Sequence, residues 1–396
     1  MKVLVINSGS SSIKYQLFDM PEENVICSGL VERIGLKNSK IHYKTSENNI
    51  SQIIDIPNHK VGLEKIVEYL LHEDTGVIAS TDEILAVGHR VVHGGKAFSD
   101  TTVVTEEVKA KIKQLFTLAP QHNPANLEGI IVAESIFPKA QQIAVFDTAF
   151  HQTIPVEAYK YAIPNQFLEE HNIRVYGFHG TSHKYVSEKA IEHLGENTSK
   201  IITIHLGNGC SMTAIKDGKS IDTTLGFGTV SGLIMGSRSG DIDQAVIFHL
   251  VENLGYELKD VKAMLQKESG MFGLTGFSDL RDIEDRAMEG DEVCQLALDM
   301  NAYRIKKYIG SFAAAMNGLD AIVFTAGVGE NSDIIRKLAC TKMEYLGIEL
   351  DEEKNKVRAR KIEDLHTENS KVKILAIPTN EEVEIARQTC KLLKNQ

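Results

Sequence analysis

Tryptophan is absent from the 396 residues, proline occurs eight times and cysteine only five times. The cysteines are scattered and none forms a Cys-x-x-Cys pair, so neither a disulfide framework nor a zinc site is indicated. No apolar run approaches the ~20 residues of a membrane span, and no basic segment leads into an apolar signal region at the N-terminus. We therefore expect a cytoplasmic protein with reduced thiols and no membrane partner.

Positive charge is also scarce, since 43 Lys and Arg residues face 54 Asp and Glu residues, giving a net charge of -11. This balance disfavours nucleic acid or an anionic membrane as a partner. Any site for an anion must therefore supply its own local cations. The length exceeds what one hydrophobic core usually serves, so two domains are expected.

A small-residue turn near the N-terminus has a counterpart close to half a chain later. The apolar run at 3–6 is followed by Asn7 and five small or hydroxyl residues. Apolar and polar residues then alternate, which predicts the second strand of a hairpin. The amides of this turn, with Ser10, Ser12 and Lys14, suit an anionic oxygen, although an ordinary Gly/Ser hairpin loop explains the segment equally well. The same layout of strand, Asn/Gly/Ser turn and strand recurs at 201–212. The chain is therefore predicted to be duplicated.

Polar side chains follow buried strands in the first half. Arg90 lies in a glycine-rich loop at 88–95, Asp147 ends an apolar strand, and His122 precedes a helix for which Asn123 is the expected cap. Strand ends are where α/β proteins bind ligands. Each residue also has a plain structural explanation: a surface arginine, a turn cap and a loop histidine.

The second half offers similar features. His179 and His183 have the i, i+4 spacing of a metal pair, but the residues between them lie before the helix, so a metal pair is the weaker alternative. The uncharged, glycine-rich stretch 223–237 predicts a mobile loop over a site, with Arg238 just beyond it. Residues 321–332 predict a strand, a Gly-x-Gly turn and a helix start, which is the third phosphate-type turn.

Together these residues supply cations, hard oxygen ligands and glycine turns. Phosphoryl transfer needs this combination, because positioning and charge neutralisation matter more there than a protein nucleophile. Carboxylates and an amide oxygen suit Mg²⁺ with several waters retained, and paired arginines hold a carboxylate or phosphate bidentately. Glu382 is expected only to complement a helix dipole. The cations and donors are Lys14, Arg90, His122, His179, His205 and Arg238, and the oxygen ligands are Asn7, Asp147 and Glu381.

With these motifs the chain resembles the acetate and propionate kinase family, of the sugar kinase, Hsp70 and actin superfamily, over essentially its whole length. The resemblance implies an α/β fold of duplicated ribonuclease H-like (actin-like ATPase) domains with an active-site cleft between them. The implied domains are 1–149 plus 382–396, and 150–381. The motifs that carry the resemblance lie at residues 7–14, 88–95, 122–126, 146–151, 177–183, 205–209, 236–241 and 327–331.

The resemblance also implies an activity: a homodimer that transfers the γ-phosphoryl group of ATP to acetate, reversibly and in line, giving acetyl phosphate and ADP. Mg²⁺, or alternatively Mn²⁺, is the implied metal. The implied catalytic residues are Arg90, His122, Asp147, His179 and Arg238, and the implied metal ligands are Asn7 and Glu381. The implied ATP-binding residues are Lys14, Ser10, Ser12, His205, Leu206, Gly207, Asn208, Gly209, Asp279, Leu280, Arg281, Gly327, Val328, Gly329, Glu330 and Asn331.

The acyl pocket departs from the family pattern. By resemblance, acetate contacts Arg90 and a methyl pocket, which is formed by Val92, Gln121, Phe178 and Thr229. Gln121 stands where the family usually has an apolar residue, and Thr229 lies in Gly-Thr-Val-Ser-Gly instead of Thr-Pro-Leu-Glu-Gly. A propionate or other short-chain carboxylate kinase is therefore an alternative. A nucleotide-driven chaperone or filament ATPase of the same superfamily is the alternative from another class.

Overall fold

The computed structural model describes residues 1–195 and 199–395. The chain divides into two compact units, here called unit 1 (residues 1–150 with 380–396) and unit 2 (residues 151–379). The resemblance implies a second boundary at 381/382, whereas Asn380 and Glu381 belong to unit 1 in the structure. This assignment matters because it puts Glu381 in the same unit as Asn7, Arg90 and Asp147.

Unit 1 is built on an eight-stranded sheet with the strand order β5-β4-β3-β2-β1-β6-β8-β7. Strands β1 to β5 pair antiparallel in sequence, and β1, β6 and β8 are parallel. The strands are β1 (Lys2–Ser8), β2 (Ser12–Asp19), β3 (Asn24–Glu32), β4 (Lys40–Lys44), β5 (Asn49–Ile53), β6 (Ile84–Val91), β7 (Thr102–Val103) and β8 (Gln141–Phe146). The helices are α1 (His59–Leu70), α2 (Glu106–Gln114), α3 (Asn123–Ile136) and α15 (Glu381–Lys394), with short 3-10 turns at Thr81–Glu83 and Leu115–Thr117.

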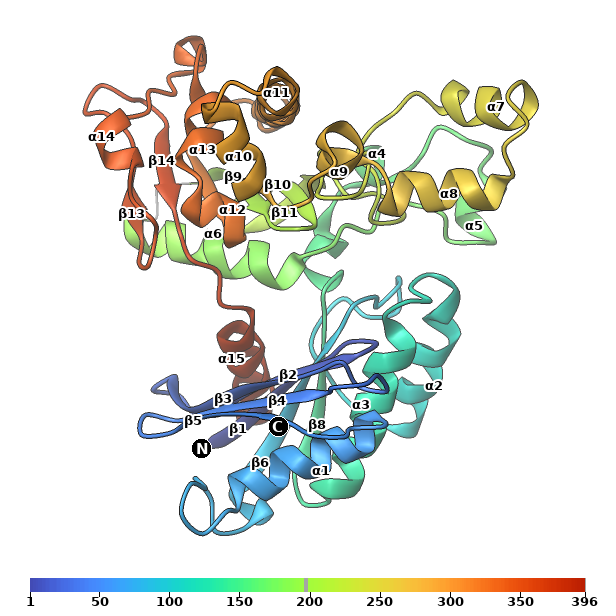
Figure 1. Cartoon of the computed structure of the whole chain (residues 1–396), viewed down its shortest axis with the longest axis vertical. Coiled ribbons are helices and arrows are strands. Elements are labelled where there is room, and N and C mark those ends of the chain that lie inside the picture. The colour runs from blue at the N-terminus through green and yellow to red at the C-terminus, as the bar shows by residue number, and fades with distance from the viewer. Residues whose placement is uncertain (196–198, 396) are drawn as a thin grey trace. The chain divides into compact units, whose positions relative to one another are not determined.

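Helices cover both faces of this sheet (Figure 1). On one face, Ile6, Tyr15 and Leu17 from the first hairpin pack in one buried cluster with Leu63 and Ile66 of α1. On the other face, α15 contacts β1 and β6. Gly88 of β6 permits this close approach, because a Cβ there would lie 2.9 Å from the Ile385 side chain and closer still to Thr389. The last helix of the chain thus packs against the first strand.

Unit 2 repeats this plan with a six-stranded sheet in the order β11-β10-β9-β12-β14-β13. The β9–β10 hairpin is antiparallel, and β9, β12 and β14 are parallel, as β1, β6 and β8 are in unit 1. The predicted duplication is therefore confirmed. The strands are β9 (Lys200–Leu206), β10 (Cys210–Lys216), β11 (Lys219–Thr223), β12 (Ala321–Thr325), β13 (Glu363–Asp364) and β14 (Lys373–Ala376).

The helices of unit 2 include a long one, α11 (Glu292–Met316), and several short ones. The others are α4 (Val156–Tyr159), α5 (Gln166–Glu169), α6 (Gly180–Leu194), α7 (Gln244–Glu252), α8 (Leu258–Lys267), α9 (Gly270–Thr275), α10 (Leu280–Met288), α12 (Ala326–Asn331), α13 (Asp333–Cys340) and α14 (Glu352–Asn355). Short 3-10 turns lie at Ala149–Thr153 and Glu344–Leu346. Among residues 1–195 and 199–395, none of the helices combines the length and hydropathy that a bilayer crossing needs.

Two local predictions are wrong. The Gly-x-Gly turn at 327–329 is helical, because α12 begins at Ala326 and contains both glycines. The cap of α3 is His122 and not Asn123, whose side chain instead exchanges two hydrogen bonds with the backbone of His93. Local sequence patterns could not reveal that long-range partner.

Candidate active site

Three predicted residues meet in unit 1 around the Arg90 guanidinium. Arg90 lies near the end of β6, Asp147 directly follows β8, and Glu381 is the first residue of α15. Arg90 Nη2 donates to Asp147 Oδ2 at 2.6 Å, and its Nε lies 3.5 Å from Glu381 Oε2. Burial alone would lower the pKa of Arg90, but the Asp147 and Glu381 carboxylates raise the pKa above its ordinary value. The charge of this cation is therefore already compensated within unit 1.

A second ion pair lies beside this cluster. Lys14 contacts Glu382 at 2.6 Å, and only 9 % of the Glu382 side chain is exposed, so the expectation that Glu382 merely complements a helix dipole is wrong. Asn7 is the cross-strand partner of Lys14 in the β1–β2 register. Burial raises the pKa of Glu381, with Asp147 and Glu382 adding to the rise and Arg90 and Lys14 opposing it. A cation would relieve this crowding of carboxylates.

The turn that joins β1 and β2 is tight and partly open to solvent. Gly9 N donates to Ser12 O at 2.8 Å, and the Gly9 carbonyl lies 2.6 Å from His59 Nε2. Ser10 is exposed and Ser12 is half-buried. The described residues contain no cluster of three or more His, Cys, Asp or Glu side chains placed to hold a metal ion. A metal here would need ligands from water or substrate as well.

The remaining predicted residues of unit 1 surround the start of α3. Gln121 and His122 are exposed, and His122 occupies the N-cap position without a side-chain capping bond. Val92 is buried, and its backbone N donates to Asn126 Oδ1 at 3.0 Å. Asn126 in turn donates to Ser8 O at 2.7 Å, which ties α3 to the first hairpin. Val92 and Gln121 therefore lie in unit 1, whereas Phe178 and Thr229 lie in unit 2, and the methyl pocket stays a prediction.

In unit 2 the predicted residues His179 and Arg238 converge on the β9–β10 turn. A Cβ on Gly209 would lie 3.5 Å from His179 Cε1 and 3.6 Å from Arg238 Nη2. Gly236, near Arg238, donates through its backbone N to Asn208 O at 3.2 Å. The imidazole and the guanidinium therefore face the same glycine of the turn, which is an arrangement suited to an anionic group.

The electrostatic surroundings of Arg238 differ from those of Arg90. Arg238 Nη1 donates to Thr229 O at 2.8 Å, and within residues 1–195 and 199–395 it forms no ion pair with a carboxylate. Burial lowers the pKa of Arg238 from its ordinary value. Because an arginine guanidinium stays protonated in proteins, Arg238 is a partly buried cation whose charge a bound anion would balance.

His179 is positioned by Ser211, which the sequence reasoning did not single out, and by the predicted residue His205. Its Nδ1 lies 2.8 Å from Ser211 Oγ, and its ring stacks on His205 with centroids 4.2 Å apart. The same Ser211 hydroxyl lies 2.7 Å from Nε2 of His183, which is buried and has a pKa well below its ordinary value because of that burial. Ser211 could have been found from hairpin register, since it faces His205 across the two strands.

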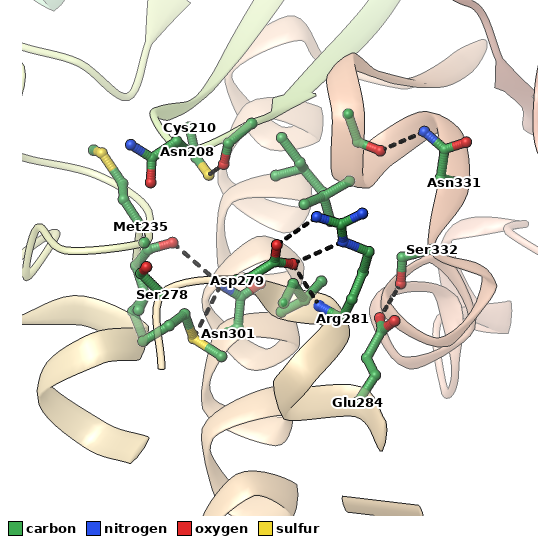
Figure 2. Close-up of a pocket in the computed structure, with 18 of the residues that line it drawn as sticks. Asn208, Cys210, Met235, Ser278, Asp279, Arg281, Glu284, Asn301, Asn331 and Ser332 are labelled. Atoms are coloured by element: carbon green, nitrogen blue, oxygen red, sulfur yellow. Dashed lines mark hydrogen bonds and ion pairs between the residues drawn. The ribbon is translucent and has the colours of Figure 1, made fainter. Parts of the chain in front are cut away.

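A cavity of about 790 Å³ in unit 2 brings together most of the predicted ATP-binding residues (Figure 2). Segments from the β9–β10 turn, the start of α10 and α12 all line it. Four predicted residues of unit 2 do not line the cavity: His205, Gly209, Gly329 and Glu330. Residues that the sequence reasoning missed also line it, among them Glu284, Asn301, Ser332, Arg358 and Arg360. The predicted residues that line it are Leu206, Gly207, Asn208, Asp279, Leu280, Arg281, Gly327, Val328 and Asn331.

One ion pair and one hydrogen bond between a carboxyl group and a hydroxyl group border this cavity (Figure 2). Asp279 caps α10 and accepts two side-chain hydrogen bonds from Arg281, at 3.0 and 2.6 Å. These hydrogen bonds lower the pKa of Asp279 to about 2. Glu284 accepts a hydrogen bond from the Ser332 hydroxyl, and burial raises the pKa of Glu284. The cavity therefore presents both a fixed carboxylate and a cation to a ligand.

A buried arginine supports one wall of the cavity. Arg336 is fully buried and donates to Gly329 O at 2.9 Å. It also donates to Asn355 O at 2.6 Å and to Val357 O at 2.9 Å. Arg336 thus ties α12 to the segment that leads into Arg358. Asn355 and Val357 are distant from Arg336 in the sequence, so no local motif predicts these contacts.

Two α/β units with the same central strand order, each bearing a small-residue turn on its first hairpin, form the arrangement of the actin-like ATPase fold. A family model described as the acetokinase family matches residues 2–387. The acetate kinase of Flavobacterium johnsoniae is 66% identical over 395 residues, covering all of both chains, and that of Carboxydothermus hydrogenoformans is 50% identical over 410 residues, again covering all of both. The chain belongs to the acetokinase family.

Solved structures agree with this family. A crystal structure of Porphyromonas gingivalis acetate kinase matches with a TM-score of 0.94 and 45% identity, covering 99% of each chain. A propionate kinase from Francisella tularensis matches with a TM-score of 0.92 and 42% identity, covering 98% of this chain and 99% of that one. The family and fold class predicted from the motifs are therefore confirmed.

Proposed function

We propose that the protein is an acetate kinase, which transfers the γ-phosphoryl group of ATP to acetate and forms acetyl phosphate and ADP. A carboxylate oxygen of acetate forms the new bond to phosphorus as the bond to the ADP oxygen breaks, without a covalent enzyme intermediate. The observation that carries the proposal is the convergence of His179 and Arg238 on Gly209 in a chain 66% identical to an acetate kinase. The chaperone or filament alternative is not favoured, because the relatives are kinases of small carboxylates.

Arg238 and His179 are proposed to act on the transferring group. The Arg238 guanidinium has no carboxylate partner in the described part of the chain, so an anion gains the full interaction with it. His179, held at Nδ1 by Ser211, is proposed to donate from its other nitrogen to a phosphoryl oxygen as charge develops there. Arg90 is proposed to hold the acetate carboxylate, with Asp147 fixing the guanidinium and His122 nearby.

Mg²⁺ is the proposed metal, with Mn²⁺ as an alternative. The oxygen donors of unit 1 fit a hard cation: Asn7 lies opposite Lys14 on the hairpin, and Glu381 is crowded by other carboxylates. Because no cluster of three or more acidic or imidazole ligands exists among the described residues, waters and phosphate oxygens would complete the coordination. When bound, the metal supplies neutralisation of the phosphate charge.

ATP is proposed to occupy the cavity of unit 2. The turn at 205–209 would bind phosphates, and the segments at 279–281 and 327–331 would hold the adenosine. A cavity of about 790 Å³ falls within the range usual for small-molecule sites. Lys14, Ser10 and Ser12 are proposed as donors to ATP phosphates, although Lys14 pairs with Glu382 in this structure.

Acetate is the proposed acyl substrate, with propionate as the runner-up. Val92 and Phe178 are buried apolar residues, whereas Gln121 is exposed and Thr229 is half-buried. Arg238 Nη1 donates to the backbone carbonyl of Thr229, an acceptor that any residue at this position would supply. The propionate kinase among the structural relatives keeps this alternative open.

We also propose that the protein is a homodimer in the cytoplasm. All five cysteines are free and buried, which fits a reducing compartment. In unit 2, helix α7 has no buried residue although it contains Val246 and Phe248, which are 43 % and 60 % exposed. Tyr303 of α11 is 65 % exposed. Apolar side chains exposed in this number suit a second copy of the chain, and light scattering on the purified protein tests it.

The proposed function is tested by incubating the protein with ATP, Mg²⁺ and acetate in the presence of hydroxylamine. Acetyl hydroxamate should accumulate in proportion to acetate, and ADP should form at the same rate. Without acetate, ATP hydrolysis should be far slower, because a closed site excludes water. ATP turnover that does not depend on any carboxylate would reject the kinase and favour a nucleotide-driven switch.

A further inference from the structure

The segment that carries Arg238 is closed at its base by its own end residues. Asp241 N donates to Gly232 O at 3.0 Å, and Gly232 N donates to Asp241 Oδ1 at 2.6 Å. Gly232 has a φ of +88°, and a Cβ there would lie 2.7 Å from Thr224 O. Residues 232–241 therefore form a ring of backbone with a fixed closure.

Helix α11 holds this closure from outside with two side chains. The Tyr308 hydroxyl donates to Asp241 Oδ2, so the two carboxylate oxygens of Asp241 each have their own donor. Arg304 Nη1 donates to Gly232 O at 2.9 Å and to Asp241 O at 3.2 Å. Arg304 and Tyr308 are four residues apart and share one face of the helix. Both ends of the ring are thus bound to a helix of 25 residues.

The far side of the ring is held by the start of α9. Backbone N–H groups donate to three consecutive carbonyls just before Arg238. Gly270 allows this contact, because a Cβ there would lie 2.2 Å from Met235 O. The pairs are Met271 to Met235 at 2.8 Å, Phe272 to Gly236 at 2.9 Å and Ser269 to Ser237 at 3.1 Å. The backbone around Arg238 is therefore fixed from two sides.

We propose that Tyr308, together with Arg304 and Asp241, is a positioning group for Arg238. The proposal rests on the proposed function, in which Arg238 binds the transferring phosphoryl group. Tyr308 acts through the ring: its hydroxyl fixes Asp241, Asp241 fixes Gly232, and the closed ring sets the direction from which Arg238 reaches the Gly209 turn. A displacement of about 1 Å at a catalytic group can cost on the order of 100-fold in rate.

The protonation state of the groups supports this role. Burial raises the pKa of Tyr308, with the Asp241 and Asp222 carboxylates adding to the rise and Arg304 opposing it, so the hydroxyl remains a donor across the neutral range. The Asp241 side chain is 45 % exposed. Loss of the Tyr308 hydroxyl therefore leaves no buried unpaired charge, and the fold should tolerate it.

The test is Tyr308→Phe, which keeps the ring and removes only the hydroxyl. We expect kcat for acetyl phosphate formation to fall about tenfold or more, with KM for ATP within about twofold of the wild type and thermal unfolding little changed. Tyr345→Phe, at a tyrosine of unit 2 that is 77 % exposed, is the matched control and should behave as wild type. Equal effects from Tyr308→Phe and Tyr345→Phe would overturn the proposal.

A double-mutant cycle separates positioning from a general structural role. In an Arg238→Ala background, assayed at high enzyme concentration, Tyr308→Phe should have no further effect on kcat, because the group it positions is gone. The same fold-decrease in both backgrounds would overturn the proposal while leaving the proposed function intact. Absence of acetyl phosphate formation by the wild type would instead reject the proposed function.

Discussion

The Arg90 guanidinium donates a 2.6 Å hydrogen bond to the carboxylate of Asp147, which is 1 % exposed. In unit 1 a carboxylate therefore balances the charge of Arg90. In unit 2, Arg238 has no carboxylate partner in the part of the chain that the structure describes. The two arginines share a proposed role in anion binding but differ in their electrostatic surroundings. Their substitutions should therefore differ in their effects on stability.

Arg90→Ala and Arg238→Ala should each lower kcat/KM by several powers of ten, but only Arg90→Ala should destabilise the fold. Removing Arg90 takes away one side of a buried ion pair, the 2.6 Å contact with the Asp147 carboxylate, and such a loss typically costs about 3 to 5 kcal/mol. Removing Arg238 takes no ion-pair partner from a carboxylate in the part of the chain that the structure describes. Urea unfolding monitored by circular dichroism measures the difference, and Lys219→Ala, at an exposed position of β11, is the control. Equal loss of turnover in all three variants would contradict the assigned roles.

Gly209→Ala should fold normally and lose activity. The added Cβ would meet His179 and Arg238 at 3.5 to 3.6 Å, which is ordinary van der Waals contact, but it would occupy space that we assign to a phosphoryl oxygen. Steady-state kinetics should show a fall in kcat of about tenfold or more. Gly310→Ala in α11, where the nearest atom would be 3.9 Å away, is the control. Wild-type kinetics for Gly209→Ala would remove this turn from the site.

Asp279→Asn should raise KM for ATP and leave KM for acetate unchanged, because Asp279 lines the proposed nucleotide cavity. Its neighbour Arg281 would lose its ion pair and the fixed orientation that comes with it. Asp351 caps α14 in the same way but does not line the cavity, so Asp351→Asn controls for loss of a helix cap. A rise in KM for ATP of similar size in both variants would argue against the cavity as the ATP site.

Stability should fall on acidification below about pH 6.5, partly through His89. Burial lowers the pKa of His89 to about 4, so between about 6.5 and 4 the unfolded chain binds a proton that the folded chain does not. His89 should therefore lower the free energy of unfolding by up to about 1.4 kcal/mol for each pH unit across this window. His89→Gln keeps a donor for Gln142 and should reduce the slope of unfolding free energy against pH. An unchanged slope would show that His89 does not contribute.

Local pattern was sufficient for the duplicated hairpins and for the strand-end residues Arg90 and Asp147, because strand, turn and strand-end positions are encoded within a few residues. It was insufficient for Arg336 and Tyr308, whose partners Asn355 and Asp241 lie 19 and 67 residues away in the sequence. The Gly-x-Gly segment shows the same limit: packing of α12 made helical a sequence whose local preference is a turn. No residue near Glu382 in the sequence reveals its partner, because Lys14 contacts Glu382 only in the folded chain.

The measurement that tests the central claim most directly is the acyl-acceptor profile at fixed ATP and Mg²⁺. We predict that kcat/KM is highest for acetate and falls by about 10-fold or more with each added methylene, in line with the ~1 to 3 kcal/mol that a hydrophobic pocket gains per methylene. Hydroxamate formation from acetate, propionate and butyrate gives the three values. A kcat/KM for propionate or butyrate that equals or exceeds the acetate value would contradict the assignment as an acetate kinase.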